Sequence, residues 1–396
     1  MPEQCILVIN TGSSSLKFGL YAERDGDEQV LLDGLADGIG QSSSTLVIKD
    51  GDGKALRSEA LSFTSRHEAL THAAQWLDEL SPGKPYAVGH RVVHGGPRLV
   101  QHQRITPTVI SELEAALHFA PLHIPMALQL IQEAERAYPD APQFACFDTA
   151  FHQTMPERAA RFALPRQLFD EGIRRYGFHG LSYESIVHQM GSKLPSRTVI
   201  AHLGSGASLV AVKDGQSIDT SMGLTPTGGI PMATRTGDLD PGVFLYLQRA
   251  KKMDADALEK LLNHDAGLTA LSGGTGDMRK LQDAAAHGDH DAELAIEVFC
   301  LSIRKFVAAY AAALGGLDML IFAGGIGERS AIVRSDVCRG LEFVGVGIDE
   351  ARNRANAATI SQPTSKVQVC VVPSREDRQI ARHCREMMQG LKPGVS

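Results

Sequence analysis

The sequence predicts an α/β fold that is built twice, with a turn of small residues opening each copy. Strand-like apolar runs alternate with helical patterns along the chain, and a strand–turn–strand pattern occurs both at residues 5–21 and at residues 198–213. The chain has 396 residues and is 43% hydrophobic, which provides apolar material for two cores. Two α/β domains of this kind, facing each other, would bring the two turns together across a cleft.

The elements of the first copy begin with a hairpin. Residues 5–10 and 16–21 have the pattern of strands on either side of a turn of Thr, Gly and Ser residues. A helix is predicted over residues 68–80, where Ser65 and Glu68 form a capping box and the apolar residues share one face. The remaining predictions are strands at 30–35, 44–49, 87–93 and 144–147, helical stretches on either side of 121–125, and a helix at 181–190.

The second copy opens with strands at residues 198–203 and 209–213. A long helix is predicted at 291–314, because apolar residues recur at helical spacing and the pattern stops at two glycines. Strands at 319–323 and 367–372 each precede a helix. The second half of the chain therefore repeats the order of the first in outline.

Charge and cysteine content narrow the class of protein. The chain has 39 Lys and Arg against 46 Asp and Glu, a net charge of −7, so no general attraction to nucleic acid or anionic lipid is expected. The first apolar run is too short for a signal peptide, and no run approaches the length of a membrane span. Six scattered cysteines are typical of buried reduced thiols. We expect a cytoplasmic protein with no nucleic-acid or membrane partner.

Several segments have the composition of phosphate-binding turns. The turn before Lys17 exposes backbone N–H groups and hydroxyls, and so does the turn after His202, although ordinary hairpins fit both patterns. A strand leads into the glycine cluster at 324–327 and then a helix, which would place backbone donors and the positive helix end at one spot. The G-x-G-x-x-G and P-loop patterns are absent. Residues 271–279 form a further flexible loop, which fits a surface turn before a helix equally well.

Charged and polar side chains stand at the ends of predicted strands. Arg91 lies on a strand that runs into glycines, and Arg235 lies among turn formers, where unrelated ion pairs or a shared phosphoryl site would both explain them. Asp148 follows a buried strand directly, which suits a catalytic group or a helix cap. His179 fits a functional or a core histidine. Glu376 begins the last helix, where the helix dipole alone favours a carboxylate.

Taken together, these motifs resemble those of one family. Residues 8–18 closely resemble the first signature of acetate kinases, and further blocks resemble that family in the same order, from about residue 5 to residue 385. The blocks are 89–96, 147–156, 176–180, 202–208, 234–241 and 323–328.

The resemblance implies two duplicated actin-like (ribonuclease H-like) domains facing an active-site cleft. Residues 1–150 would form the N-terminal domain, with the C-terminal helix 376–396 packing back on it, and 151–375 the nucleotide-binding domain. It also implies reversible transfer of the ATP γ-phosphoryl group to acetate, giving acetyl phosphate and ADP, with Mg²⁺ or Mn²⁺, in a homodimer.

The resemblance also implies roles by position. Asn10 and Glu376 would hold the metal ion, Asp148 would act at the catalytic centre, and His179 and Arg235 would stabilise the transition state. Arg91 would bind the substrate carboxylate, beside an acyl pocket of Val93, Leu122, Phe178 and Pro226. The nucleotide would contact Lys17, His202, Leu203, Gly204, Ser205, Gly206, Asp277, Met278, Arg279, Gly324, Gly325, Ile326, Gly327 and Glu328.

These roles fit the chemistry, because a carboxylate substrate is already ionised at neutral pH and needs no general base. Asp148 is then expected to orient Arg91 or the metal rather than to abstract a proton. The main obstacle is repulsion between two anions, which the two arginines, His179 and the metal would neutralise.

The sequence departs from the usual family pattern at three places. Ser205 stands where the family generally has Asn, Ile124 replaces an Asn, and Thr227-Gly228-Gly229 replaces an L-E-G-like tripeptide. A propionate kinase of the same family therefore stays possible, because one methylene in an apolar pocket is worth only about 1–3 kcal/mol. The sequence also leaves room for a non-catalytic actin-like ATP-binding protein and for a sugar or glycerol kinase.

Overall fold

The computed structural model describes residues 4–11, 15–40, 43–81, 83–121 and 123–390. The chain divides into two compact units. Unit 1 comprises Met1–Ala150, Gly180–Ser185 and Arg375–Ser396, and unit 2 comprises Phe151–His179 and Ile186–Ser374. The segment Gly180–Ser185 thus groups with unit 1, although the boundary expected at residue 150 places it in the second domain.

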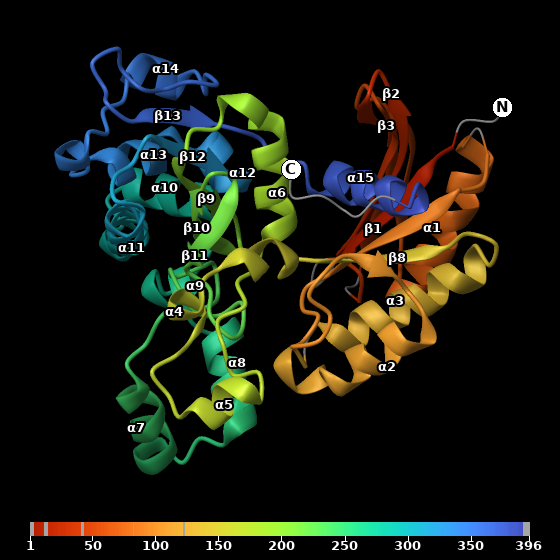
Figure 1. Ribbon diagram of the computed structural model, residues 1–396, viewed down its shortest axis with the longest axis horizontal. Coiled ribbons are helices and arrows are strands. Elements are labelled where there is room, and N and C mark those ends of the chain that lie inside the picture. The colour runs from red at the N-terminus through yellow and green to blue at the C-terminus, as the bar shows by residue number, and fades with distance from the viewer. Residues whose placement is uncertain (1–3, 12–14, 41–42, 82, 122, 391–396) are drawn as a thin grey trace. The chain divides into compact units, whose positions relative to one another are not determined.

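Unit 1 is a sheet with helices on both faces (Figure 1). Its elements are β1 (Ile6–Thr11), β2 (Ser15–Arg24), β3 (Asp27–Asp37), β4 (Ser44–Asp50), β5 (Ala55–Leu61), α1 (Arg66–Leu80), β6 (Ala87–Val92), β7 (Gln103–Arg104), α2 (Pro107–Ala115), α3 (Ile124–Ala137), β8 (Gln143–Phe147), the start of α6 (Gly180–Met190) and α15 (Glu376–Met388).

Unit 2 contains the second sheet and more helices. Its elements are α4 (Glu157–Ala160), α5 (Arg166–Asp170), the rest of α6, β9 (Arg197–Leu203), β10 (Ala207–Lys213), β11 (Gln216–Thr220), α7 (Pro241–Lys251), α8 (Ala255–His264), α9 (Gly267–Leu271), α10 (Met278–Ala286), α11 (His290–Leu314), β12 (Met319–Ala323), α12 (Gly324–Arg329), α13 (Ala331–Cys338), α14 (Glu350–Arg354) and β13 (Gln368–Val371).

The two sheets repeat one arrangement of strands. The order is β5-β4-β3-β2-β1-β6-β8-β7 in unit 1 and β11-β10-β9-β12-β13 in unit 2. In each, an antiparallel meander (β1-β2-β3 or β9-β10-β11) is joined through its first strand to two parallel strands (β6 and β8, or β12 and β13). This shared order and direction confirms the duplicated α/β fold that the two hairpins predict.

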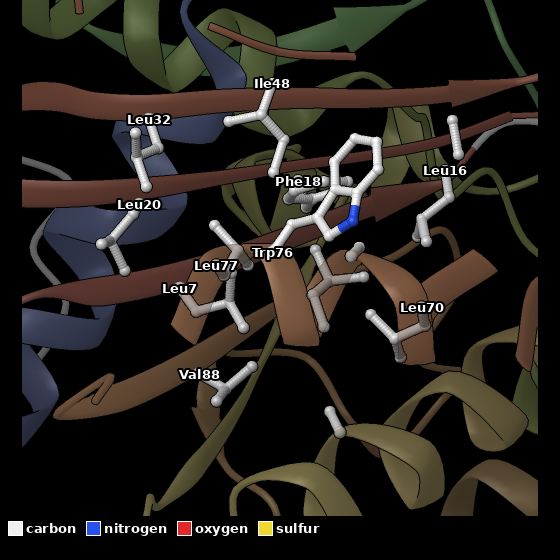
Figure 2. Packing of buried hydrophobic residues seen from close by; sticks show 14 of the residues in the cluster. Leu7, Leu16, Phe18, Leu20, Leu32, Ile48, Leu70, Trp76, Leu77 and Val88 are labelled. Atoms are coloured by element: carbon white, nitrogen blue, oxygen red, sulfur yellow. The ribbon is translucent and has the colours of Figure 1, made fainter. Parts of the chain in front are cut away.

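The sheet of unit 1 is covered on both faces, because successive residues of a strand point to opposite sides. On one face Leu7 of β1 belongs to a core with Trp76 of α1 and Leu130 of α3, part of which Figure 2 shows. On the other face Ile6 belongs to a core with Ile380 of α15. Burying apolar side chains on both faces stabilises the sheet by about 25 cal/mol for each Å² removed from water.

Helix α15 supplies the second face although it comes last in the chain. It lies along the strands of unit 1, contacting β1, β3 and β6 (blue in Figure 1). Beside its apolar residues, Arg385 is tied to the buried Glu28 of β3 by a 2.6 Å hydrogen bond from Nε to Oε1. The helix therefore holds its first turn in a fixed place on the sheet.

Helix α11 forms the matching cover in unit 2, where it contacts β9 and β10. The side chain of Asp289 accepts a hydrogen bond from the backbone N–H of Ala292 at its start, and Gly315 ends it with φ 72°. The predicted helix at 291–314 is thus confirmed within one residue. Among the described residues, none of the helices combines the length and the apolarity that crossing a bilayer would require.

Strand β5 and helix α12 are among the elements that differ from the sequence expectations. Strand β5 extends the sheet of unit 1 at its edge with mostly exposed residues, so it lacks the apolar alternation that would have revealed it. The glycine cluster was expected as a turn before a helix, and instead it forms the first turn of α12, with Ala323 as N-cap. Ser330 then caps the separate helix α13.

Candidate functional site

Arg91 and Asp148 meet at the carboxyl ends of two neighbouring parallel strands of unit 1. Arg91 of β6 pairs with Cys146 of β8 in the ladder, and Asp148 follows β8 directly. Two nitrogens of the Arg91 guanidinium donate to the Asp148 carboxylate. Nη2 donates to Oδ2 at 2.6 Å, and Nε donates to Oδ1 at 3.2 Å and to Oδ2 at 3.1 Å. Asp148 is buried and Arg91 is partly exposed. A planar, fixed guanidinium of this kind suits recognition of a further carboxylate or phosphate.

The same network continues to the end of β1. Arg91 Nη1 donates to the amide oxygen of Asn10 at 3.3 Å, and Asn10 Nδ2 donates to Oδ1 of Asp377 at 2.8 Å. Asp377 Oδ2 pairs with Lys17 Nζ at 2.6 Å. The structure therefore brings together, within unit 1, four of the residues singled out from the sequence. It adds Asp377, whose only sequence signal is an acidic residue in a first helical turn.

Glu376 begins α15 and acts on the same charge network. Burial alone would lower the pKa of the Arg91 guanidinium, but the carboxylates of Asp148 and Glu376 raise it, and the net shift is upward. Burial raises the pKa of the Asp148 carboxyl, and the ion pair with Arg91 opposes that rise. The carboxylate of Glu376 and the amide oxygen of Asn10, which accepts from Arg91, are the hard oxygen ligands that Mg²⁺ prefers, so this donor set fits the implied ion.

A second group of site residues lies in unit 2, around His179. This residue is buried and adopts the left-handed conformation, with φ 60°, immediately before α6. Such a conformation is uncommon outside glycine and persists where the surroundings enforce it. His179 Nδ1 lies 2.8 Å from Ser208 Oγ, and its ring stacks on His202 with centroids 4.4 Å apart. The imidazole is therefore held in one orientation.

The glycine turn between β9 and β10 allows its backbone to lie close to His179. A Cβ at Gly206 would lie 3.3 Å from His179 Nε2 and 3.7 Å from Nη1 of Arg235, so the bare backbone leaves room for both side chains. The carbonyl of Ser205 accepts from the N–H of Ala233 at 3.1 Å, which joins the turn to the segment that carries Arg235. Arg235 Nη1 itself donates to the carbonyl of Pro226 at 3.2 Å.

The other candidate nucleotide-binding residues lie at the starts of two helices. A Cβ at Gly324 would lie 2.7 Å from the carbonyl oxygen of Leu203, so α12 begins directly against the end of β9. The side-chain carboxylate of Glu328 accepts from the N–H of Ser374 at 3.1 Å. Asp277 caps α10, and its carboxylate pairs with the exposed Arg279 at 3.0 Å. The loop at 271–279 therefore leads directly into helix α10, which both interpretations of its sequence allow.

The acyl-pocket candidates are distributed over the chain. Phe178 is buried, and its carbonyl accepts a hydrogen bond from Nε2 of the buried His152 at 3.0 Å. Pro226 lies beside Arg235 in unit 2, and Val93 follows β6 in unit 1. Leu122 lies outside the described residues.

The residues that depart from the family pattern have structural roles. Ile124 is buried at the start of α3, and Thr227 Oγ1 donates to Asn263 Oδ1 at 2.6 Å. The side chain of Ser205 is exposed, and its hydrogen bond to Ala233 uses the backbone carbonyl. A change of side chain at this position can therefore alter contacts in the turn without breaking the bond to Ala233.

A buried cluster of His102, Glu184 and His383 also has ligand-type side chains, whose atoms lie within 4.8 Å of one another. Glu184 Oε2 lies 3.2 Å from His102 Nε2 and 2.9 Å from His383 Nε2. However, His102 Nδ1 accepts the backbone N–H of Phe147 at 3.0 Å, so its proton is on Nε2, which donates to Glu184. The cluster is a buried ion-pair network, and the sequence hides it because its members are 82 and 199 residues apart.

Comparisons with known proteins agree with one another. The model of the Acetokinase family matches residues 5–382. A protein named acetate kinase from Methylocella silvestris is 43% identical, with 98% of this chain and 99% of its own length covered, and one from Clavibacter sepedonicus is 45% identical, with 95% and 97% covered.

Solved structures agree with this result. Porphyromonas gingivalis acetate kinase has a TM-score of 0.87 at 37% identity, with 97% of this chain and 100% of its own covered. A propionate kinase from Francisella tularensis has a TM-score of 0.91 at 36% identity, with 98% and 100% covered. With the duplicated sheet and the residue groups described above, these matches show that the chain belongs to the acetokinase family.

Proposed function

We propose that the chain is an acetate kinase, which transfers the γ-phosphoryl group of ATP directly and reversibly to acetate and so yields acetyl phosphate and ADP. The observation that carries this proposal is the Arg91–Asp148 pair at the ends of β6 and β8. Asp148 and Asn10 engage Arg91 through Nε, Nη1 and Nη2, one N–H group each, and a guanidinium has five. N–H groups thus remain to bind a substrate carboxylate.

The reaction needs no general base, but it needs positive charge close to the reacting groups. Acetate is ionised at neutral pH, so no proton has to be removed before it attacks. The attack brings a carboxylate towards an anionic phosphoryl group, and positioned cations are the general means of lowering such a barrier. In this proposal Arg91 holds acetate, Asp148 fixes the orientation of Arg91, and His179 and Arg235 stabilise the charge on the transferring phosphoryl group.

Nucleotide and metal binding belong to the same proposal. The turn from His202 to Gly206, the starts of α10 and α12, and Lys17 contact ATP through backbone N–H groups and cationic side chains. Asn10 and Glu376 hold Mg²⁺ or Mn²⁺ through their oxygens. When bound, the ion neutralises phosphate charge.

Propionate is the second candidate substrate, because a propionate kinase is among the similar structures. We propose that Val93, Leu122, Phe178 and Pro226 line the acyl pocket, and that acetate is preferred. Since one methylene changes binding by about 1–3 kcal/mol, both acids are expected to react at different rates.

The test is to trap the acyl phosphate. Purified protein, ATP and Mg²⁺ are incubated with acetate, propionate or butyrate, and hydroxylamine converts any acyl phosphate to a coloured hydroxamate. We expect product with acetate at the highest kcat/KM. A higher value with propionate would assign the second candidate, and nucleotide binding without hydroxamate would instead support a non-catalytic ATP-binding protein.

We further propose a cytoplasmic homodimer. The six cysteines are buried free thiols, which suits a reducing compartment. In unit 2, the segment around α7 exposes large apolar side chains at Leu239, Val243, Leu245 and Tyr246, as an interface does before its partner is added. Light scattering coupled to size exclusion would give twice the chain mass of 42.5 kDa if the proposal is correct.

A further inference from the structure

One carboxylate from the last helix bridges two strands at the first hairpin. Asn10 of β1 and Lys17 of β2 stand directly opposite each other in the antiparallel ladder. Asp377 reaches this pair from α15, with Oδ1 accepting from Asn10 Nδ2 at 2.8 Å and Oδ2 pairing with Lys17 Nζ at 2.6 Å. Asp377 is 6% exposed, so both of its contacts are shielded from water on the carboxylate side.

These contacts determine which way the Asn10 amide faces. A carboxylate only accepts hydrogen bonds and a guanidinium only donates them. Asp377 therefore requires the NH₂ group of Asn10, and Arg91, 3.3 Å away on the other side, requires its oxygen. The two neighbours agree, and the amide oxygen is turned to Arg91, the guanidinium whose pKa the nearby carboxylate of Glu376 helps to raise.

We propose that Asp377 is a positioning residue for the metal site: it holds the amide of Asn10 with its oxygen, and not its NH₂ group, directed to the bound cation. The inference rests on the proposed function, in which Asn10 and Glu376 are the metal ligands. Partners behind a metal ligand commonly change affinity by about 10–100-fold when they are removed.

Asp377 is a poor choice of residue for a merely structural role. Helix α15 is already attached through Ile380 in the core and through the Arg385–Glu28 pair. Burying a carboxylate costs free energy, and an apolar side chain at a purely packing position would avoid that cost. The carboxylate of Asp377 instead contacts Asn10, near the end of β1, and Lys17, near the start of β2.

The decisive variant is Asp377→Asn, which keeps the size of the side chain. Its amide oxygen can accept from Lys17, and its NH₂ group then faces Asn10. The amide of Asn10 must rotate to offer its oxygen to position 377, and its NH₂ group turns to the cation. We expect Mn²⁺ binding in the presence of ADP, measured from the paramagnetic resonance of free Mn²⁺, to weaken about 10-fold or more.

The double variant Asn10→Asp/Asp377→Asn tests the direction of the bond itself. A carboxylate at position 10 can only accept, so it pairs with the NH₂ group at position 377 and still presents oxygen to the cation. We expect it to bind Mn²⁺ at least about fivefold more tightly than Asp377→Asn does, within the range that outer ligand partners control. Absence of this rescue would overturn the proposal.

Two further variants separate positioning from folding. Glu28→Gln makes the same carboxylate-to-amide change at another attachment of α15, and it should lower the melting temperature without weakening Mn²⁺ binding. Asp377→Ala should lower the melting temperature more than Asp377→Asn does, yet weaken Mn²⁺ binding no more, because the amide of Asn10 is then released and not reversed. Equal Mn²⁺ binding by wild type and Asp377→Asn, or weakening that follows melting temperature across all variants, contradicts the inference.

A different result would show that the proposed function itself is wrong. A wild-type protein that gives no hydroxamate with any of the three acids would refute the kinase assignment, whatever the variants bind. A wild-type protein that is active, with an Asp377→Asn variant that binds Mn²⁺ normally, would refute the role of Asp377 alone.

Discussion

At the scale of single residues, the site depends on side chains whose charges are fixed by their neighbours. Arg91 is held by Asp148 and Asn10, and His179 is held by Ser208 and His202. Both side chains are thus oriented before any substrate binds, and a preorganised group costs no reorganisation during the reaction.

Replacing either arginine tests this arrangement. Arg91→Ala and Arg235→Ala should each lower kcat/KM for acetate by about 100-fold or more, because a positioned arginine contributes at least this much to phosphoryl transfer. Binding of ATP, followed by calorimetry, should change little. Arg98→Ala is the matched control, since Arg98 is an exposed arginine paired with Glu112, and its kinetics should be normal. Near-normal rates in both site variants would contradict the assigned roles.

Ser205 offers a test on the nucleotide side. Ser205→Asn restores the residue that the family generally has in this turn, and an added amide donor near phosphate is worth about 1 kcal/mol. We therefore expect the KM for ATP to fall about fivefold, with the KM for acetate unchanged. The backbone bond to Ala233 is unaffected by the side chain, so an unchanged KM for ATP would count against placing this turn at the nucleotide.

At the scale of elements, α15 is held by groups whose charge depends on pH. His383 is buried between Glu184 and Glu386, with His102 and Gln379 also against it. Burial is the largest single influence and lowers the pKa of His383, but the charges and hydrogen bonds of Glu184 and Glu386 together outweigh it and raise the pKa to about 9. Burial raises the pKa of Glu184, but the two histidines lower it, to about 2. The helix is therefore attached by an ion pair at neutral pH.

The sign of the resulting pH dependence follows from these shifts. A histidine whose pKa is raised on folding stabilises the protein fully below its unfolded pKa near 6.5, and that stabilisation is lost as pH rises through about 9. We expect the free energy of unfolding of wild type to exceed that of His383→Gln by a few kcal/mol at pH 6, and the difference to shrink towards pH 10. Urea denaturation at intervals of pH measures it; a difference that grows with pH would refute the ion pair.

How far the sequence predicts each element depends on the range of the interactions that form it. The helix α11 and strands β1, β9 and β12 are set by local apolar patterns, and they appear within a residue or two of their predicted bounds. The edge strand β5 has no such pattern, since its residues are mostly exposed. Its place in the sheet depends on pairing with β4, which a local pattern does not reveal.

The same distinction applies to the candidate site. Arg91 and Asp148 could be named because one lies near the end of a recognisable strand and the other follows one, whereas Asn10 is named through the family resemblance. Asp377 could not, since its acidic side chain in a first helical turn looks like an ordinary response to the helix dipole. Its partners are 367 and 360 positions earlier in the chain, and only the folded arrangement of α15 on β1 and β2 brings them together.

At the scale of the whole molecule, the first and last parts of the chain form one unit. Ending the chain after Ser374 would remove α15 and leave the apolar face of β1, β6 and β8 without its cover. We expect limited proteolysis of that variant to cut residues 15–150 rapidly and to spare the β9–β13 sheet of unit 2. A chain ending at Gly390 retains α15 and should resist digestion like wild type; equal resistance of the shorter chain would contradict the role of the helix.

The duplicated sheets divide the candidate residues between the units. Arg91, Asp148, Asn10 and Glu376 belong to unit 1, and His179, His202 and Arg235 belong to unit 2. Each group sits where the first hairpin and the parallel strands of its own sheet end. Under the proposed function, a single architecture, used twice, would thus supply a place for the acid substrate in one copy and for the nucleotide in the other.

Helix α15 follows the strands that it covers at a long distance in sequence, and this separation affects folding during synthesis. A ribosome releases the strands of unit 1 first, and more than two hundred residues must follow before the helix that covers their second face emerges. During that interval the nascent sheet presents bare Ile6, Val8 and Phe144, so a holding chaperone has a defined surface to bind until α15 has emerged.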